Sequence, residues 1–456
     1  MTLDLSLSSL LAHAPLLAFS TVFICFFVIY ITGSFKKTPK YELLSQDPIS
    51  NSDAKTPISA SELGWETGHG YPTITPQPAS LSWETTEPLV FRPFKPKYHL
   101  TMGITPCDYN ELIPMDKTYL ERLSLRRELL KEYPDVVRGV DINPERPDPV
   151  MDEKIRDALC EWYGYVMGVY LPQRYPGMFV LIDSKDEGID EGKKGEGKGK
   201  MLKSLVTGLS VPIDPKEAMD SVSFSGTSEE QKVKEKLIHL LDTLGTWVDE
   251  DFLILLPKLP SSPTSPNLPP SNSTQQQEPK YHLSAYTTYY PAGFDTRTKL
   301  GRPLNEIHAP VPRYEPKLEK SMDRFFGKLE VGRAVVRVNW SIMTKGTGLF
   351  CAFGGLHSYK EGNSDGEEEV LKADDIDGKE TFLRCERQTL HRLPKTKALL
   401  FGFHTYTYPL DDVKREGLGE ELAAAIEGLK SGSVPEVYGY KMGKYWGEGV
   451  KAFLRA

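Results

Sequence analysis

The densest group of potentially reactive side chains surrounds one histidine. His308 lies in the sequence KLGRPLNEIHAPVPRY, residues 299–314, where a short apolar helical turn meets a Pro-x-Pro stop. Imidazole is a common metal ligand, and the prolines that follow restrict the backbone and therefore the direction of the ring. A histidine here could instead cap the C-terminal end of a helix, where its charge would suit the helix dipole. The residues by themselves leave both interpretations open.

Three cations flank this histidine in the sequence, namely Lys299, Arg302 and Arg313. Ammonium and guanidinium groups that lie close together are suited to binding an anionic group. They could equally form a basic surface in contact with solvent. From the residues alone, that second interpretation is the better one.

A second polar segment, FLRCERQTLHRLP, spans residues 382–394. On a β-strand, successive side chains point to opposite faces, so both faces of this strand would carry polar groups. One face would carry Arg384, Glu386 and Gln388, and the other Cys385, Arg387 and Thr389. Because buried polar groups need partners, we expect at least one face to line a polar pocket. The alternative is an exposed edge strand whose charges prevent aggregation.

Composition and missing motifs exclude several classes of function. The formal net charge is −8, which argues against nucleic acid as the main partner because phosphate binding needs a basic face. The five cysteines are widely spaced and include no CxxC pair, so neither a zinc ribbon nor an iron–sulfur cluster is indicated. The sequence contains no GxGxxG, Walker, GxSxG or HExxH motif, so neither a nucleotide-binding fold nor an autonomous hydrolase is supported.

An apolar segment near the N-terminus predicts a membrane anchor. Residues 14–32, APLLAFSTVFICFFVIYIT, carry no charge, and a helix of this length spans the ~30 Å core of a bilayer. A cleaved signal peptide would need a basic region before the segment. That flank contains Asp4 and no Lys or Arg, whereas three lysines follow within residues 33–40. The positive-inside rule therefore places residues 1–13 in the lumen and the large C-terminal part in the cytosol.

Tracts of biased composition divide the rest of the chain. Residues 33–88 are rich in Ser, Thr, Pro and Gly and predict a flexible stalk. We expect a folded domain over residues 89–410 and a C-terminal extension over residues 411–456. Three tracts inside the domain have too few apolar residues to pack and are predicted to be disordered insertions. They lie near residues 183–200, 259–279 and 360–379.

Hydrophobic periodicity predicts an α+β fold. Helices are expected over residues 119–132, 153–170, 233–241 and 317–329. In the first helix, leucines occupy one side and charged residues the other, and the second is expected to end before Pro172. Strands are expected over residues 283–290, 334–342, 382–390 and 398–408, which are rich in aromatic and β-branched side chains. No regular βαβ alternation is present, so an antiparallel sheet is expected.

The order of these segments resembles a known family. FRPFKPKYHLTMGI, DKTYLERLSLRREL, LPQRYP, EDFLILL and YYPAGFDTRTKLGRPLNEIHAPVP precede VNWS, ERQTLHRLP and FHTYTYPL. The series is similar to the alpha-subunit-like family of haem-dependent oxidative N-demethylases, also called HRQ family proteins. Its most specific strings are GRPLxxIHxPVP and ERQTLxRLP. The resemblance runs from Phe91 to Leu410 and is interrupted by the three insertions.

This resemblance implies a Per-ARNT-Sim (PAS)-like fold, an antiparallel sheet with flanking helices over one face, here preceded by one transmembrane helix. It also implies haem b as the cofactor and the NADPH-dependent oxidative demethylation of a small amine with O₂. A separate reductase, carrying FMN and a 2Fe-2S cluster, would supply the electrons. The absence of such motifs from this chain agrees with that division of labour.

The resemblance also assigns roles to matching positions. His308 becomes the proximal ligand of the haem iron. The candidates for binding the haem propionates are Lys299, Arg302 and Arg313. The catalytic candidates are Arg387 and Gln388, whose hydrogen-bond donors would polarise O₂ in the distal pocket.

Two other functions remain compatible with the sequence. One is a haem-based sensor of a gas or of redox state, although no sensor output domain is recognised. The other is a scaffold that has kept the fold and lost the haem. A membrane anchor would bring a haem domain close to a membrane-bound reductase, because confinement raises the effective concentration. We therefore expect the endoplasmic reticulum, with the C-terminal domain in the cytosol.

Overall fold

The computed structural model describes one compact unit of the chain. This unit lies within Pro57–Ala456. The described residues are 70–456, except 79, 93, 185–198, 225–227, 259–278, 345, 355 and 357–369. Within them, no helix has the length and apolar character needed to cross a membrane. The predicted transmembrane helix over residues 14–32 lies outside the described residues.

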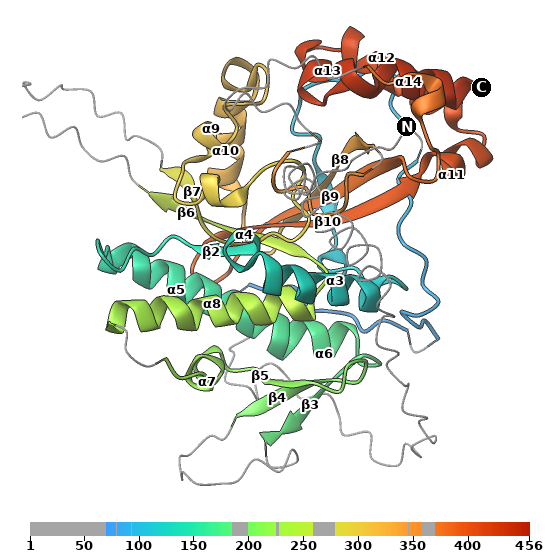
Figure 1. The fold of residues 1–456 in the computed structure, drawn as a ribbon. Coiled ribbons are helices and arrows are strands. Elements are labelled where there is room, and N and C mark those ends of the chain that lie inside the picture. Colours follow the sequence, from blue (N-terminus) through green and yellow to red (C-terminus); the bar gives the residue numbers. More distant parts are fainter. Residues whose placement is uncertain are drawn as a thin grey trace, which may run out of the picture. The chain divides into compact units, whose positions relative to one another are not determined.

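A seven-stranded antiparallel sheet runs through the middle of this unit (Figure 1). Its strands, in spatial order, are β1 (Thr105–Cys107), β8 (Ala334–Met343), β9 (Phe382–Arg392), β10 (Leu399–Pro409), β6 (Asp251–Lys258), β7 (Lys280–Thr287) and β2 (Arg138–Val140). All four predicted strands are present, with ends that differ by up to three residues. The prediction of an α+β fold with an antiparallel sheet is therefore confirmed.

The connections place the polar strand β9 inside the sheet. β6 and β7 form a hairpin, helices follow, and β8, β9 and β10 form a meander whose last strand returns to pair with β6. β9 consequently has a neighbour on each side, and its residues from Leu383 to Arg392 are all buried. The alternative interpretation of this segment as an exposed edge strand is wrong.

Helices cover both faces of the sheet, so the expectation of helices over one face only is wrong (Figure 1). One face packs against α3 (Tyr119–Glu132), α5 (Pro149–Tyr165) and α8 (Glu229–Trp247), and the other against α9 (Leu304–Ile307) and α10 (Lys320–Lys328). We call these the α5 face and the α9 face. Leu390 of β9 packs with α10, whereas Leu400 of β10 packs with α5 and α8. Because successive side chains of a strand point to opposite faces, these two residues assign the other side chains of β9 and β10 to one face or the other. Gln388 therefore lies on the α9 face and Arg387 on the α5 face.

The helix that begins as α5 is longer than the sequence indicates. It continues through a π-helical turn, Val166–Tyr170, into α6 (Leu171–Arg174), so it contains Pro172 instead of ending before it. In the wider turn, the Leu171 N–H bonds the Val166 carbonyl, five residues back. A proline at the next position lacks an N–H and needs space behind its ring, and the π turn supplies that space.

The C-terminal residues belong to the same compact unit. They form α11 (Leu410–Arg415), α12 (Gly419–Ser431), α13 (Glu436–Tyr440) and α14 (Gly443–Arg455). Leu422, Trp446 and Val450 of these helices pack against Leu383 and Tyr406 at one end of β9 and β10. Residues 411–456 are thus an integral part of the fold rather than an appended tail.

Two predicted flexible tracts are partly ordered. In the predicted stalk over residues 33–88, the ring of Tyr71 stacks on Tyr165 at 3.6 Å, and Ile74 is buried. In the predicted insertion over residues 360–379, Ile376 is buried in the core beside the C-terminal helices. A few apolar side chains are enough to hold such segments in place, and composition averaged over a tract conceals them.

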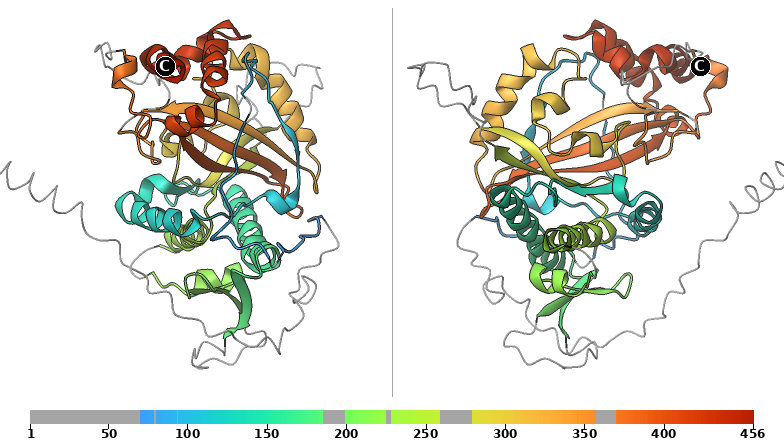
Figure 2. Two further views of the ribbon diagram at one scale, coloured as in Figure 1. Left: turned by 90° about the vertical axis from the view of Figure 1, so that its right-hand side faces the viewer. Right: turned by 60° about the vertical axis from the view of Figure 1, so that its left-hand side comes forward.

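A small second sheet lies at the opposite end of the unit from α12 and α14 (Figures 1 and 2). It consists of β3 (Phe179–Asp183), β4 (Lys200–Ser204) and β5 (Ser210–Pro212), followed by α7 (Pro215–Asp220). The predicted insertion over residues 183–200 connects β3 to β4, and the insertion over residues 259–279 connects β6 to β7. The central positions of both insertions lie outside the described residues.

Candidate functional site

His308 lies at the C-terminal end of α9, over the sheet. Its backbone N–H bonds the Leu304 carbonyl, and the ring atom Nδ1 lies 2.8 Å from the same oxygen. A carbonyl oxygen can only accept, so Nδ1 carries the proton and Nε2 presents a lone pair. The ring also stacks on Tyr314, with centroids 4.9 Å apart and planes at 13°. These contacts fix both the tautomer and the direction of the ring, as is usual for a metal-binding imidazole.

The surroundings of His308 keep it neutral. Burial lowers its pKa to about 4, the hydrogen bond from Nδ1 to Leu304 opposes this shift, and the nearby charges of Lys299 and Arg337 add to it. The position agrees with the interpretation as a helix cap, but near pH 7 the ring carries no charge with which to meet a helix dipole. A neutral imidazole with a free Nε2 lone pair is the form that coordinates iron.

On the α9 face of the sheet, β8 and β9 carry a connected row of polar side chains. The Arg337 Nε donates to Gln388 Oε1 at 2.7 Å, and Gln388 Nε2 donates to Glu386 Oε2 at 3.1 Å. The other carboxylate oxygen of Glu386 accepts from Arg384 Nη2 at 3.3 Å. Both ends of the Gln388 amide are therefore occupied, which fixes its orientation and that of Arg337.

Beside this polar row, the helices leave part of the α9 face uncovered. Leu253 and Phe401 are cross-strand partners on the interior strands β6 and β10, yet both remain partly exposed. Ile307 and Val311, on either side of His308 in the sequence, are also only partly buried. Interior strands of a sheet normally bury their apolar side chains completely. The site thus combines an uncovered apolar surface with a neutral histidine and a polar border.

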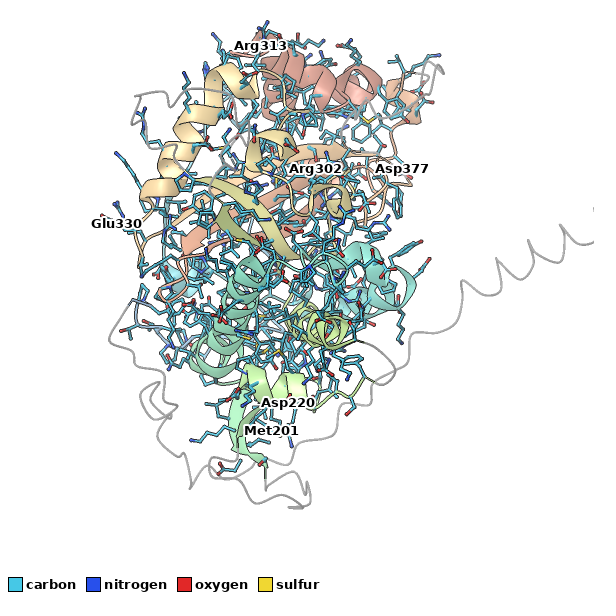
Figure 3. All side chains as sticks on the ribbon, turned by 90° about the vertical axis from the view of Figure 1, so that its left-hand side faces the viewer. Met201, Asp220, Arg302, Arg313, Glu330 and Asp377 are labelled. Carbon is cyan, nitrogen blue, oxygen red and sulfur yellow. The ribbon has the colours of Figure 1, made fainter. Side chains whose placement is uncertain are left out.

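Of the three flanking cations, the structure brings Lys299 to His308. Burial lowers the pKa of Lys299 to about 8, and its ammonium lies 4.1 Å from the centroid of the Phe294 ring. Arg302 is exposed at the surface. Arg313 is exposed as well, and its Nε forms an ion pair with Glu436 at 3.1 Å. Figure 3 shows that Arg302 and Arg313 lie well apart from each other.

The two catalytic candidates on β9 lie on opposite faces of the sheet. Gln388 lies on the α9 face, where it is bonded to Arg337. Arg387 faces α5, where its Nη2 lies 3.4 Å from Glu111 Oε2 and 3.5 Å from Cys107 Sγ. Adjacent residues of a strand cannot line the same pocket. Only Gln388 belongs to the site that contains His308.

Two cations of the site are not among the sequence-predicted residues. Arg337 lies in the segment RVNWS, which the sequence marks as an aromatic strand without assigning this side chain. Lys441, between α13 and α14, is only 3% exposed. Its Nζ donates to the Asn339 side chain at 3.0 Å and to the Trp340 carbonyl at 2.5 Å. No local pattern marks Lys441, because its partners lie about a hundred residues away in the sequence.

A separate group of buried charges lies beside α3. Arg122 and Arg126 are on the buried side of this helix, so the prediction that its charged residues face outwards is wrong for both. Arg126 bonds Asp251 at 2.9 Å, and both arginines pair with Asp249. His404 lies 3.2 Å from Glu250 Oε2 in the same group. Hydrogen bonds and ion pairs within the group compensate most of these charges, which indicates a structural role.

The comparison with protein families gives one result. The family model described as "Haem-dependent oxidative N-demethylase, alpha subunit-like" matches residues 103–451. This range includes the whole seven-stranded sheet, His308, and the C-terminal helices nearly to the end of α14. It therefore extends past residue 410, where the recognised sequence motifs end, and contains Lys441. The chain belongs to the haem-dependent oxidative N-demethylase, alpha subunit-like family.

Proposed function

We propose that the chain is a haem-dependent oxidoreductase that carries out oxidative N-demethylation of a small amine. The observation that carries this proposal is the state of His308: it is neutral, its Nδ1 is held by the Leu304 carbonyl, and it lies between the partly buried apolar residues Ile307 and Val311 in the chain. The description of the family to which the chain belongs supports the same cofactor and reaction class. An antiparallel sheet with helices inserted between β7 and β8 also supports the PAS-like fold that the resemblance implies.

The residues of the site fit a haem group. His308 Nε2 would bind the iron, and Leu253, Phe401 and Ile307 would contact the apolar macrocycle. Lys299 is placed to meet a propionate, whereas Arg302 and Arg313 point to solvent or to Glu436. Bound haem b would supply the redox chemistry with O₂ that no side chain of this chain can perform.

The polar row on β8 and β9 orients donors within the site. Gln388 holds the Arg337 guanidinium at 2.7 Å and is itself held by Glu386 at 3.1 Å. Arg337 Nη1 also donates to the Met102 carbonyl at 3.4 Å, and the other N–H groups of the guanidinium would be able to donate to an oxygen atom of a bound group. Gln388 would then act chiefly by positioning Arg337. Arg387 would act from the opposite face, as part of the support of the strand.

We further propose that electrons come from a separate reductase carrying NADPH, FMN and a 2Fe-2S cluster. The family takes its name from an alpha subunit, which presupposes at least one other subunit. The sequence contains no nucleotide-binding GxGxxG motif and no CxxC pair, so it offers no sites of its own for these groups.

Haem binding by the purified chain tests the assignment of His308. We expect a Soret band in the loaded protein and its loss, or a more than tenfold weaker affinity, in His308→Ala. The matched control is His282→Ala, because His282 is also half-buried and its Nδ1 also lies against a carbonyl, that of Lys280, at 3.0 Å. An unchanged haem spectrum in His308→Ala would refute the assignment. Formaldehyde release from a methylated amine, dependent on NADPH and reductase, would distinguish the enzyme from a haem-based sensor.

A membrane location remains part of the proposal. Residues 14–32 would anchor the chain, with the haem domain in the cytosol and the endoplasmic reticulum as the expected membrane. Deletion of residues 1–40 should move the protein from the membrane pellet to the supernatant after carbonate extraction. A full-length chain that carbonate already releases would contradict the anchor.

A further inference from the structure

Two cations lie side by side at the outer edge of β8. Beyond Val336, this edge is no longer paired with β1, and Lys441 occupies it by donating to Asn339 and to the Trp340 carbonyl. Arg337 lies two residues before Asn339 on the same face of β8, so its side chain is next to the one that Lys441 bonds. Burial lowers the pKa of Lys441 to about 8; the charge of Glu386 opposes this shift and that of Arg337 adds to it. Like charges held this near to each other, away from bulk water, are unfavourable unless an anion joins them.

The described residues supply no carboxylate that pairs directly with either cation. No Asp or Glu oxygen among them lies within 4.0 Å of Arg337 or Lys441. The carboxylate whose charge acts on both cations is that of Glu386, and its two oxygens are already hydrogen-bonded to Arg384 and Gln388. The single negative charge of Glu386 therefore offsets the charges of three cations, Arg337, Arg384 and Lys441, and these four side chains together carry excess positive charge.

The Arg337–Lys441 pair belongs to the same site as His308. Arg337 is the cross-strand partner of Gln388, so it lies on the α9 face of the sheet, the face against which α9 packs with His308 at its end. The segment that carries Lys441 is also tied to the helices beside His308, since Lys317 Nζ donates to the Ser433 carbonyl at 2.8 Å. The C-terminal helices thus complete one border of the site.

We propose that Arg337 and Lys441 together bind a carboxylate group. A guanidinium and an ammonium with the Asn339 amide beside them offer several donors to two carboxylate oxygens, and the added negative charge removes the repulsion between the cations. The carboxylate comes either from a haem propionate or from the substrate, which would then be a methylated amine bearing an acid group. The inference rests on the proposed haem site, and it replaces the exposed Arg302 and Arg313 as the anion-binding residues.

The first arm of the test compares two porphyrins on the full chain. Iron protoporphyrin IX and its dimethyl ester, which lacks the charge of the propionates, are titrated in the same detergent and followed by absorption. If the pair binds a propionate, the free acid should bind about 10- to 100-fold more tightly, as expected for hydrogen bonds to a charged group. Lys441→Met and Arg337→Met should each remove most of this preference.

The second arm asks whether the substrate supplies the carboxylate. In the loaded protein, N,N-dimethylglycine should then perturb the haem spectrum at a concentration about tenfold lower than dimethylamine does, and Lys441→Met should remove that difference. The control for both arms is Lys430→Met, since Lys430 is in the same C-terminal region but pairs with Glu448 at 2.6 Å. Lys441→Arg, which keeps the charge, should retain the wild-type preference.

The outcomes separate the two proposals. Binding of both porphyrins with equal affinity, together with no preference for the carboxylate-bearing amine, would overturn the carboxylate site while leaving the haem assignment intact. A preference that survives in both methionine variants would overturn it as well. If neither porphyrin binds, the haem proposal itself is refuted, and the inference with it. Should Lys441→Met not fold by circular dichroism, Arg337→Met and Lys441→Arg decide between these outcomes.

Discussion

His391 provides the sharpest test of the buried interior. It lies on β9, on the α5 face, between the rings of Trp162 at 5.4 Å and Tyr109 at 5.5 Å. It is 1% exposed, and neither ring nitrogen has a hydrogen-bond partner among the described residues. Burial lowers its pKa from 6.5 to about 3. Folding therefore requires a neutral imidazole at this position.

This requirement makes the stability of the fold depend on pH in one direction. Below its ordinary pKa of 6.5, His391 takes up a proton in the unfolded chain, whereas in the folded chain it stays neutral down to about pH 3. The unfolded state thus binds more protons in this window, and the free energy of unfolding falls as the pH falls. At about pH 5, roughly 1.5 pH units below the ordinary pKa, the loss is about 2 kcal/mol at 1.36 kcal/mol per unit.

Replacing the histidine should remove this contribution. The free energy of unfolding is measured by urea titrations followed by tryptophan fluorescence. When the pH is lowered from about 7 to about 5, the free energy of unfolding of His391→Leu should rise by about 2 kcal/mol relative to that of the wild type. Leu390→Ala is the matched control, because it lies next to His391, is also buried and does not titrate. The free energy of unfolding of Leu390→Ala should differ from that of the wild type by the same amount at both pH values. A difference for His391→Leu that does not change with pH would refute the assignment of a buried neutral histidine.

Two further substitutions test contacts that hold the fold around the site. Asp249→Asn should lower the free energy of unfolding by about 3 to 5 kcal/mol in chemical denaturation, because it leaves the buried Arg122 and Arg126 without full charge compensation. The control is Glu153→Gln, which removes one partner of an exposed ion pair and should change the free energy of unfolding by less than about 1 kcal/mol. Equal effects of the two substitutions would contradict a structural role for Asp249. Gly428→Ala should cost about 1 to 3 kcal/mol, because the added methyl group would lie 2.2 Å from the Pro96 carbonyl oxygen and push away the segment next to Arg337. Gly327→Ala, in α10 with open space around it, should instead leave the melting temperature unchanged or raise it, and a similar loss in both variants would exclude the steric explanation.

The sequence by itself determined the elements of the fold and the importance of His308. The strands of the meander, the helix over residues 119–132 and the choice of an antiparallel sheet depend on local periodicity, which a single sequence displays. The Pro-rich turn after His308 likewise marks a side chain with a fixed direction. These features are local, because they depend on residues within a few positions of one another.

Only the tertiary structure decided which of the marked side chains meet. Alternation along β9 separates Arg387 from Gln388, but the packing of α9 on one face determines that Gln388 is the one near His308. The burial of Arg122 and Arg126 depends on carboxylates from a distant segment, so a helix that looks amphipathic in the sequence buries its charges. Lys441 reaches the site only because the C-terminal helices pack at the open edge of β8. A buried charge is stable only where another group compensates it, and that group can lie far away in the sequence. No local sequence pattern therefore indicates which side chains will meet.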